Sequence, residues 1–353
     1  MPLGLVHDPI FQEHDPGSFH PESPRRLAVL DRALDKWPGL EKTVRIPLRA
    51  ATQEELARVH QKSHINRIAS TDGREMALDM DTRTSPGSYN AALYAAGSLI
   101  DLCDAALDGK VTNGIAFVRP PGHHATPVRA MGFCLFNNVA VAAAHLIQAR
   151  KLERILIVDW DVHHGNGTED AFFMDPKVLY FSVHQAPFYP GTGQVNTVGR
   201  AEGEGFTINV PLSSGHNDSD YISIFENLLA PVARQFKPQF ILISAGFDAH
   251  REDPLGGEGL SSLGYAAMTR VLLEIADEFC PGCVVAVLEG GYNPEAEARA
   301  GIATMEAMQG STEADKLRQA AQDAERPRSL KEAIAVQQRY WNLDNNDIEE
   351  LEM

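Results

Sequence analysis

The sequence predicts an α/β protein of three layers, in which a mainly parallel sheet lies between two layers of helices. The chain has 353 residues, enough to bury a large core. Its short apolar runs lack the polar alternation of strands that have one face in water, which is typical of parallel strands covered on both faces. Amphipathic helical patterns separate several of these runs, as a parallel sheet with crossover connections requires.

Five apolar runs are expected to form strands, and most of them end in a polar or glycine-rich turn. They are Gly114–Val118, Arg154–Asp159, Val178–Val183, Phe240–Ala245 and Cys283–Glu289. Four segments with helical periodicity are expected to form helices: Ser88–Leu107, Asn137–Arg150, Tyr221–Phe236 and Ser262–Phe279. No repeat or linker interrupts residues 1–310, so we expect one domain there.

Residues 311–353 are predicted to form a helical, acidic extension that packs on this domain or trails from it. Ser311–Arg328 is highly charged, Leu330–Tyr340 has a helical pattern, and Asn345–Met353 is an acidic end. Chain ends of this composition are expected to fray.

Polar residues follow the predicted strands at one edge of the sheet. Ligands of open parallel sheets bind outside the carboxyl ends of the strands. Side chains that can take part in catalysis or bind a metal lie at all five predicted strand ends: Arg119–Ala125, Asp159–Thr168, Ser182–His184, Ser244–Asp248 and Leu288–Tyr292. Five loops that converge on one edge predict a functional site more strongly than any single motif does.

The segment after the second strand predicts a divalent metal site. Residues i, i+2 and i+4 of an extended segment point to one face, so Asp159, Asp161 and His163 are expected to share a side. Asp248, which leaves another buried strand, is the best third ligand beside Asp161 and His163. Three protein ligands leave a position open for water and substrate, as in catalytic zinc sites.

Imidazoles and a phenol complete a hydrolytic set around that metal. His123 and His124 follow a rigid Pro-Pro-Gly turn, and histidine is the usual acid or base near neutral pH. We expect Asp159 to accept a hydrogen bond from one imidazole and Asn166 to hold the other. Tyr292, after two glycines, offers a hydroxyl to the oxyanion that develops when water attacks a carbonyl. The set predicts metal-assisted hydrolysis of an amide.

Composition and charge argue against several classes of function. The formal net charge of −17 argues against nucleic-acid binding, which normally needs a basic surface, but it does not exclude cationic substrates. No segment has the apolar length of a membrane span, and no signal peptide is visible at the N-terminus, so we expect a cytoplasmic protein without a membrane partner. Cys280-Pro-Gly-Cys283 is expected to be a structural turn rather than a redox pair.

Six motifs resemble those of the histone deacetylase family. They are Pro-Pro-Gly-His-His, Gly132-Phe-Cys-Leu-Phe-Asn-Asn138, Asp-Trp-Asp-Val-His-His-Gly-Asn-Gly-Thr, Phe188-Tyr-Pro-Gly-Thr-Gly193, Ala-Gly-Phe-Asp-Ala and Leu-Glu-Gly-Gly-Tyr. They occur in the family's order and span roughly residues 15–305. The resemblance implies the arginase/deacetylase fold, a mainly parallel sheet of about eight strands between helical layers.

The resemblance also implies roles for individual residues. Zinc would be bound by Asp161, His163 and Asp248. His124 would be the favoured base of the pair with His123, and Tyr292 would polarise the acyl carbonyl. The substrate would be contacted by Gly132, Phe133, Tyr189, Leu255 and Gly290. Structural potassium would be bound by Asp159 and Ser182 with the carbonyls of Asp161 and His163, and a second ion would lie near Phe172 and Val178. Arg26 would line the exit path of acetate.

Three positions depart from the commonest family pattern. Asn166 stands where class I enzymes carry aspartate, which places the chain nearer the class II and bacterial members. Tyr189 replaces the commoner phenylalanine and adds a hydroxyl at the tunnel mouth. Leu255 stands where polyamine-selective relatives can carry a glutamate, which argues against polyamine substrates without settling the point.

We therefore predict a zinc-dependent deacetylase that acts on acyl-lysine in peptides or proteins, or on acetylated small amines. The nearest alternative is an acetylpolyamine amidohydrolase, followed by a binuclear manganese ureohydrolase and an inactive scaffold that binds acylated partners. The sequence leaves open the physiological substrate, the acyl length, the oligomeric state and the choice between zinc and ferrous iron.

Overall fold

The protein is described by a computed structural model that covers residues 1–322 and 324–343. Its central sheet has eight strands, which run across the sheet in the order β2 (Thr43–Arg45), β1 (Leu3–Val6), β5 (Gly114–Ala116), β10 (Val284–Leu288), β9 (Phe240–Ala245), β6 (Ile155–Asp159), β7 (Val178–Gln185) and β8 (Thr207–Leu212). All neighbouring strands are parallel. The predicted parallel sheet between helices is confirmed.

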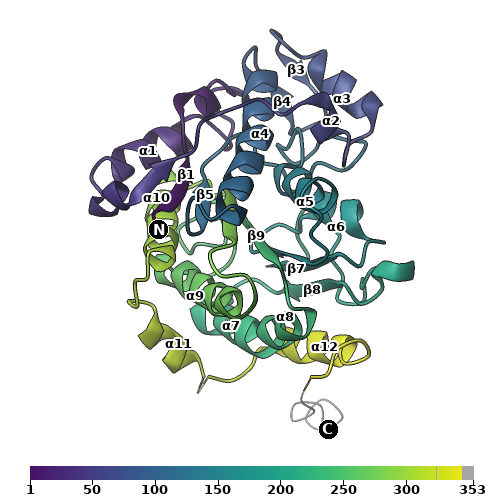
Figure 1. Cartoon of the computed structure of the whole chain (residues 1–353), viewed down its shortest axis with the longest axis vertical. Coiled ribbons are helices and arrows are strands. Elements are labelled where there is room, and N and C mark those ends of the chain that lie inside the picture. Colours follow the sequence, from purple (N-terminus) through teal and green to yellow (C-terminus); the bar gives the residue numbers. More distant parts are fainter. Residues whose placement is uncertain (323, 344–353) are drawn as a thin grey trace.

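Helices cover both faces of the sheet (Figure 1). One face carries α4 (Ser88–Leu107), α5 (Asn138–Gln148) and α6 (Asn166–Phe172). The other face carries α1 (Arg25–Leu34), α7 (Asp218–Ile224), α8 (Ala230–Phe236), α9 (Ser262–Phe279) and α10 (Pro294–Met308). The division follows from right-handed crossovers, because connections that step in opposite directions along the sheet cover opposite faces.

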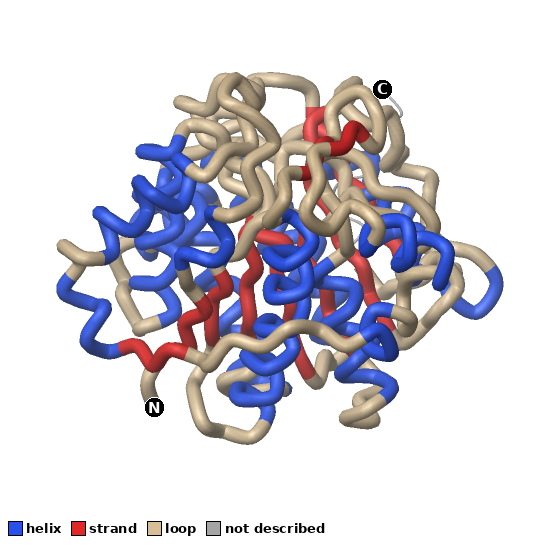
Figure 2. Tube along the Cα trace, turned by 90° about the horizontal axis from the view of Figure 1, so that it is seen from above, coloured by secondary structure: helices blue, strands red, loops and turns tan. Residues whose placement is uncertain are grey.

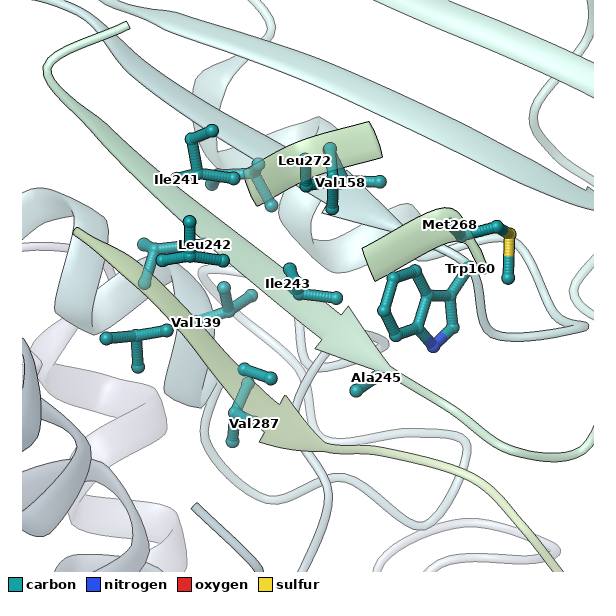
Figure 3. Close-up of a cluster of buried hydrophobic side chains, with 14 of the residues drawn as sticks. Val139, Val158, Trp160, Ile241, Leu242, Ile243, Ala245, Met268, Leu272 and Val287 are labelled. Carbon is teal, nitrogen blue, oxygen red and sulfur yellow. The ribbon is translucent and has the colours of Figure 1, made fainter. Parts of the chain in front are cut away.

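The central strands are apolar throughout because both of their faces are covered. Every residue of β6, β9 and β10 is buried. Figure 3 shows Ile241 and Ile243 of β9 among residues of α9 and Trp160, while Leu242 lies toward Val139 of α5. The alternation of side chains along β9 thus serves two apolar layers, which explains why its sequence shows no polar alternation.

The carboxyl ends of the strands face the loop-rich side of the molecule. β1 begins beside the N-terminus. Figure 2 shows that the long loops gather at the opposite end of the sheet. At this end the register pairs Asp159 of β6 with Ser182 of β7 on one side and Ser244 of β9 on the other. Polar side chains therefore begin at the same level in three adjacent strands.

Smaller elements surround this frame. They are a hairpin of β3 (Met76–Ala77) and β4 (Arg83–Thr84), the helices α2 (Gln53–Leu56), α3 (Lys62–Ala69), α11 (Asp315–Ala321) and α12 (Arg328–Gln337), and the 3₁₀ turns Pro9–Gln12, Pro38–Lys42 and Ala201–Gly203. The four free cysteines are buried, and the Cys283 N–H donates to the Cys280 carbonyl in the predicted turn (3.0 Å). Among the described residues, none of the helices combines the length and apolar character needed to cross a bilayer.

The five predicted strands and four predicted helices are present, with ends that differ by a few residues. The helix predicted over Tyr221–Phe236 begins earlier, at Asp218, and contains a π-helical turn over Phe225–Leu229 just before Pro231. Proline lacks a backbone N–H and disrupts the regular helical bonding ahead of it, which accounts for the altered turn. Three strands of the central sheet were not predicted individually: β1, β2 and β8.

The C-terminal extension packs on the sheet through α12. Leu330 and Ile334 are buried in the main core, and Gln337 Nε2 donates to the Thr207 carbonyl of edge strand β8 (3.3 Å). The helix thereby covers an edge that would otherwise be open to pairing. The boundary near residue 310 stays a prediction, and the predicted acidic end, Asn345–Met353, lies outside the described residues.

Candidate metal centre and catalytic pocket

Three side chains converge where β6 and β9 end. His163 Nδ1 lies 3.0 Å from Asp161 Oδ1 and 3.2 Å from Asp248 Oδ2. Asp161 and Asp248 are buried, whereas the His163 side chain is 12% exposed, on the side of a pocket. Within the described part of the chain, these residues form the one group of three or more His, Cys, Asp or Glu that could hold a metal ion.

The spacing of these atoms suits zinc. Zinc bonds of about 2.0–2.2 Å in a tetrahedral site place neighbouring ligand atoms about 3.3 Å apart. The observed separations of 3.0 and 3.2 Å are close to that value. Asp248 Oδ2 is buried and accepts no hydrogen bond of good geometry. A buried carboxylate oxygen left this way is costly unless a cation completes its environment, so the residues fit a metal ion.

Backbone groups of neighbouring loops fix the two ligand carboxylates. The Gly290 N–H donates to Asp161 Oδ2 (2.8 Å), and the Val162 N–H donates to Asp248 Oδ1 (2.9 Å). Gly290 also needs to be a glycine, because a Cβ there would lie 2.0 Å from Asp248 Oδ2. Its N–H and C=O are both bonded within the protein, so it holds Asp161 in place, and its predicted substrate contact stays a prediction.

The histidine pair lies beside this triad. The His123 and His124 rings are 4.0 Å apart between centroids. His123 Nδ1 lies 3.0 Å from Asp159 Oδ2, and His124 Nδ1 lies 2.8 Å from Asn166 Oδ1. Since both partners accept hydrogen bonds, each Nδ1 carries a proton and each Nε2 is left for chemistry. The contacts expected for Asp159 and Asn166 are thus present.

The two imidazoles differ in proton affinity. Burial opposes protonation of His123, but the carboxylates of Asp161 and Asp159 outweigh burial and raise its pKa to about 10. Burial, reinforced by His123 and His163, holds the pKa of His124 well below its ordinary value. A cation at the triad would offset part of the effect of Asp161 on His123. At neutral pH His123 is therefore protonated, and the neutral His124 is the member of the pair whose Nε2 is free to accept a proton.

Glu289, which the sequence reasoning did not single out, holds the loop that carries the histidines. Its Oε2 accepts the N–H groups of Gly122 (2.6 Å) and His123 (3.0 Å), and its Oε1 accepts the Ser244 hydroxyl (3.2 Å). It is fully buried. Its position directly before Gly-Gly-Tyr at a strand end was the signal that could have identified it.

A pocket of about 210 Å³ opens above the triad. Its lining contains most of the predicted substrate contacts together with Asp81, which was not predicted: Asp81, His124, Gly132, Phe133, His163, Tyr189, Leu255 and Tyr292. Tyr189 and Leu255 are each 36% exposed and form its rim. Asp81 reaches the pocket because the β3–β4 hairpin places it there, and nothing in the local sequence marks that contact.

The aromatic wall is held in an unusual backbone conformation. Phe133 has a φ of +67°, which is rare for a residue other than glycine and requires support from its surroundings. Its N–H donates to Thr82 Oγ1 (3.1 Å), and the His20 ring packs on its edge at 4.6 Å. Gly132, with φ +56°, also needs to lack a side chain, because a Cβ would lie 2.3 Å from His124 Cδ2.

Tyr292 stands between Phe133 and Arg26. Its ring meets Phe133 edge to face at 5.8 Å, and the Arg26 guanidinium lies 5.2 Å from the ring centroid. Burial, followed by the charges of Asp248 and Asp161, raises the phenol pKa well above its ordinary value, so the hydroxyl keeps its proton and can donate it in a hydrogen bond. Arg26 is itself fully buried and bonds to Glu297, Glu22 and the Glu289 carbonyl.

The residues predicted to bind potassium lie behind the triad. Asp159 and Ser182 are both buried and occupy paired positions in adjacent strands. Asp159 Oδ2 also accepts the Tyr180 hydroxyl (3.1 Å). Phe172 ends α6, and Val178 begins β7.

Comparison with known proteins places this arrangement in a family. A family model described as the histone deacetylase domain matches residues 20–308. The chain belongs to the histone deacetylase family. Histone deacetylase 5 of Arabidopsis thaliana is 42% identical over 325 residues, which cover 87% of this chain and 49% of that protein. A probable deacetylase of Archaeoglobus fulgidus is 40% identical over 299 residues, which cover 84% of this chain and 82% of that protein.

A solved structure agrees with the family assignment. The crystal structure of the HDA15 HD domain superposes with a TM-score of 0.88 and 36% identity, covering 97% of this histone deacetylase family chain and 96% of that one. The chain spans about half the length of several curated relatives that it matches, with 49% and 45% of two of them covered.

Proposed function

We propose that this chain is a zinc-dependent deacylase that hydrolyses the amide between an acetyl group and the side-chain amine of lysine or of a related amine. The observation that carries the proposal is the convergence of the triad, the histidine pair and Tyr292 on one pocket. Zinc held by Asp161, His163 and Asp248 would supply Lewis acidity to the acyl carbonyl and to the attacking water.

The side chains of the pocket would carry out the proton transfers. His124 Nε2 accepts a proton from the attacking water, while Asn166 holds its Nδ1–H. The Tyr292 hydroxyl donates a hydrogen bond to the oxyanion that forms on the acyl carbon. His123 donates a proton from Nε2 to the departing nitrogen as the C–N bond breaks. The products are acetate and the free amine, which balances one water against one amide.

An acetylpolyamine remains the second candidate substrate. Leu255 provides no charge at the rim, but Asp81 lines the same pocket and Asp79 lies beside it in the hairpin. A carboxylate at that place could attract the second ammonium group of a polyamine. The manganese ureohydrolase alternative has no such support, because it needs further bridging carboxylates at the metal site.

The test is turnover by the zinc-reconstituted protein of a matched pair of substrates, an acetyl-lysine peptide and N-acetylputrescine. Hydrolysis of the peptide supports the lysine assignment, and hydrolysis of the polyamine alone replaces it with the second candidate. Absence of turnover with both, in protein that contains one zinc per chain, would favour the non-catalytic scaffold. Two manganese ions per chain by elemental analysis would favour the ureohydrolase.

We also propose structural potassium near Asp159 and Ser182, with the carbonyls of Asp161 and His163, and a second ion near Phe172. Replacement of potassium by tetramethylammonium should then lower the melting temperature. We further propose Arg26 as a residue of the acetate exit path, supported by its place beneath the Tyr292 ring. A cytoplasmic location and the absence of nucleic-acid and membrane partners stay predictions.

A further inference from the structure

One carboxylate holds the backbone of the loop that carries Tyr292. Asp253 Oδ2 accepts the N–H of Tyr292 (2.6 Å) and the N–H of Asn293 (3.1 Å). Asp253 is only 8% exposed. A buried carboxylate that accepts two backbone N–H groups fixes both peptide planes in orientation, which is stronger control than a single bond would give.

Tyr292 depends on outside support because its own backbone supplies little. It follows Gly290 and Gly291, and Gly291 has a φ of +131° that only glycine adopts readily. Gly290 is held through its N–H and its C=O, so Gly291 is the residue of this approach at which the backbone can take other conformations. The hydrogen bond from the Tyr292 N–H to Asp253 restricts this freedom directly at Tyr292.

The second oxygen of the same carboxylate reaches the rim of the pocket. Asp253 Oδ1 accepts the N–H of Leu255 (2.9 Å), and Leu255 lines the pocket mouth. One side chain thus joins the residue at the entrance to the loop that carries the phenol inside.

We propose that Asp253 is a positioning residue that sets the Tyr292 hydroxyl for the reaction and couples it to the rim at Leu255. The inference rests on the proposed deacylase activity. It predicts that loss of the carboxylate impairs polarisation of the carbonyl rather than substrate binding. A positioning role differs here from a role in folding alone, because only the former depends on how strongly the substrate carbonyl needs the phenol.

The experiment compares two peptides of one sequence, carrying acetyl-lysine or trifluoroacetyl-lysine. The trifluoroacetyl carbonyl is already electrophilic and needs less help from a hydrogen-bond donor. Asp253→Asn keeps the volume of the side chain but removes the negative charge that strengthens the bonds to Tyr292 and Asn293. Its amide also has one acceptor oxygen for the two sides that the carboxylate serves. We expect kcat on the acetyl peptide to fall by about 10- to 100-fold, with KM changed by less than about threefold. The loss on the trifluoroacetyl peptide should be at least about fivefold smaller.

A double-mutant cycle tests whether Asp253 acts through the phenol. In a Tyr292→Phe background, Asp253→Asn should lower the residual kcat by less than about twofold, because the hydroxyl that it positions is already absent. Glu252→Gln is the matched control, since the Glu252 carboxylate pairs with Arg299 on the surface (2.7 Å). This control should leave kcat and KM on both peptides unchanged.

Each outcome decides between the two roles. Equal losses on the two peptides, or a full additive loss in the Tyr292→Phe background, would overturn the positioning role. Loss of zinc or of the circular dichroism spectrum in Asp253→Asn would also overturn it, because the residue would then serve folding. If the wild type hydrolyses neither peptide, the proposed function fails; if only the variant behaves differently from expectation, this inference fails alone.

Discussion

The buried His60 makes the stability of the catalytic loop depend on pH. Its Nδ1 lies 3.0 Å from the Thr126 carbonyl, and its Nε2 accepts the Asn137 N–H (2.9 Å). The side chain of Asn137 in turn donates to the Ala125 carbonyl (3.2 Å), next to the histidine pair. Only the neutral imidazole fits, because a second ring proton would face the Asn137 N–H.

The magnitude follows from the folded and unfolded pKa values of His60. Burial, with a smaller effect of His64, lowers the pKa of His60 from 6.5 to about 3 in the folded protein. The unfolded chain therefore binds the proton first as the pH falls, so stability is lost from about pH 6.5 downward until the pH reaches the folded pKa. Each pH unit in that window lowers the free energy of unfolding by about 1.4 kcal/mol. Protonation linked to His60 therefore lowers it by about 2 kcal/mol between pH 7 and pH 5.

Urea unfolding of the wild type and of His60→Gln at pH 7, 6 and 5 measures this effect. Glutamine retains a donor and an acceptor but does not titrate. The contributions of all other titrating groups to the pH dependence therefore cancel when the two proteins are compared. We expect the free energy of unfolding of the wild type to fall by about 2 kcal/mol more than that of the variant. Parallel loss of stability in both proteins would refute the assignment of the neutral His60 to this contact.

Two further predictions concern the metal and the phenol. Tyr292→Phe should lower kcat by about 100- to 1000-fold, the usual effect of losing one oxyanion donor, with zinc content and melting temperature unchanged; near-normal kcat would mean that another group polarises the carbonyl. Removal of the metal with a chelator should lower the melting temperature, and zinc at about 100 times its dissociation constant should raise the free energy of unfolding by about 2.7 kcal/mol. A melting temperature that does not respond to zinc would contradict binding at Asp161, His163 and Asp248.

The sequence predicted the central strands well and the outer strands poorly, for a physical reason. β6, β9 and β10 are covered on both faces and read as continuous apolar runs. β2 has one half-buried and two exposed residues, so no such run marks it. β1 has only four residues, and β8 contains Pro211, which is tolerated because β8 is an edge strand.

The same contrast applies to the site. The convergence of the triad and the histidine pair could be predicted because these side chains follow strand ends in the sequence. Asp253 acts on backbone N–H groups of a loop that is distant in the chain, and no residue type marks a backbone donor. Glu289 acts in the same way, and only its place before Gly-Gly-Tyr at a strand end marked it. Asp81 depends on a hairpin with strands of two residues each, whose position against the pocket is a tertiary effect.

The carboxylates of Asp161 and Asp248, the proposed zinc ligands, also hold backbone groups, which affects how their variants should be interpreted. Asp161 binds the Gly290 N–H with one oxygen, and Asp248 binds the Val162 N–H with one oxygen, so in each residue a single group joins a neighbouring strand end and faces the metal position. Replacement of Asp248 by alanine removes both functions and leaves a buried N–H without a partner, which costs about 1–3 kcal/mol. Asp248→Asn can keep the bond to Val162 through its carbonyl oxygen. The asparagine variant therefore separates loss of the metal from loss of loop order, and the alanine variant does not.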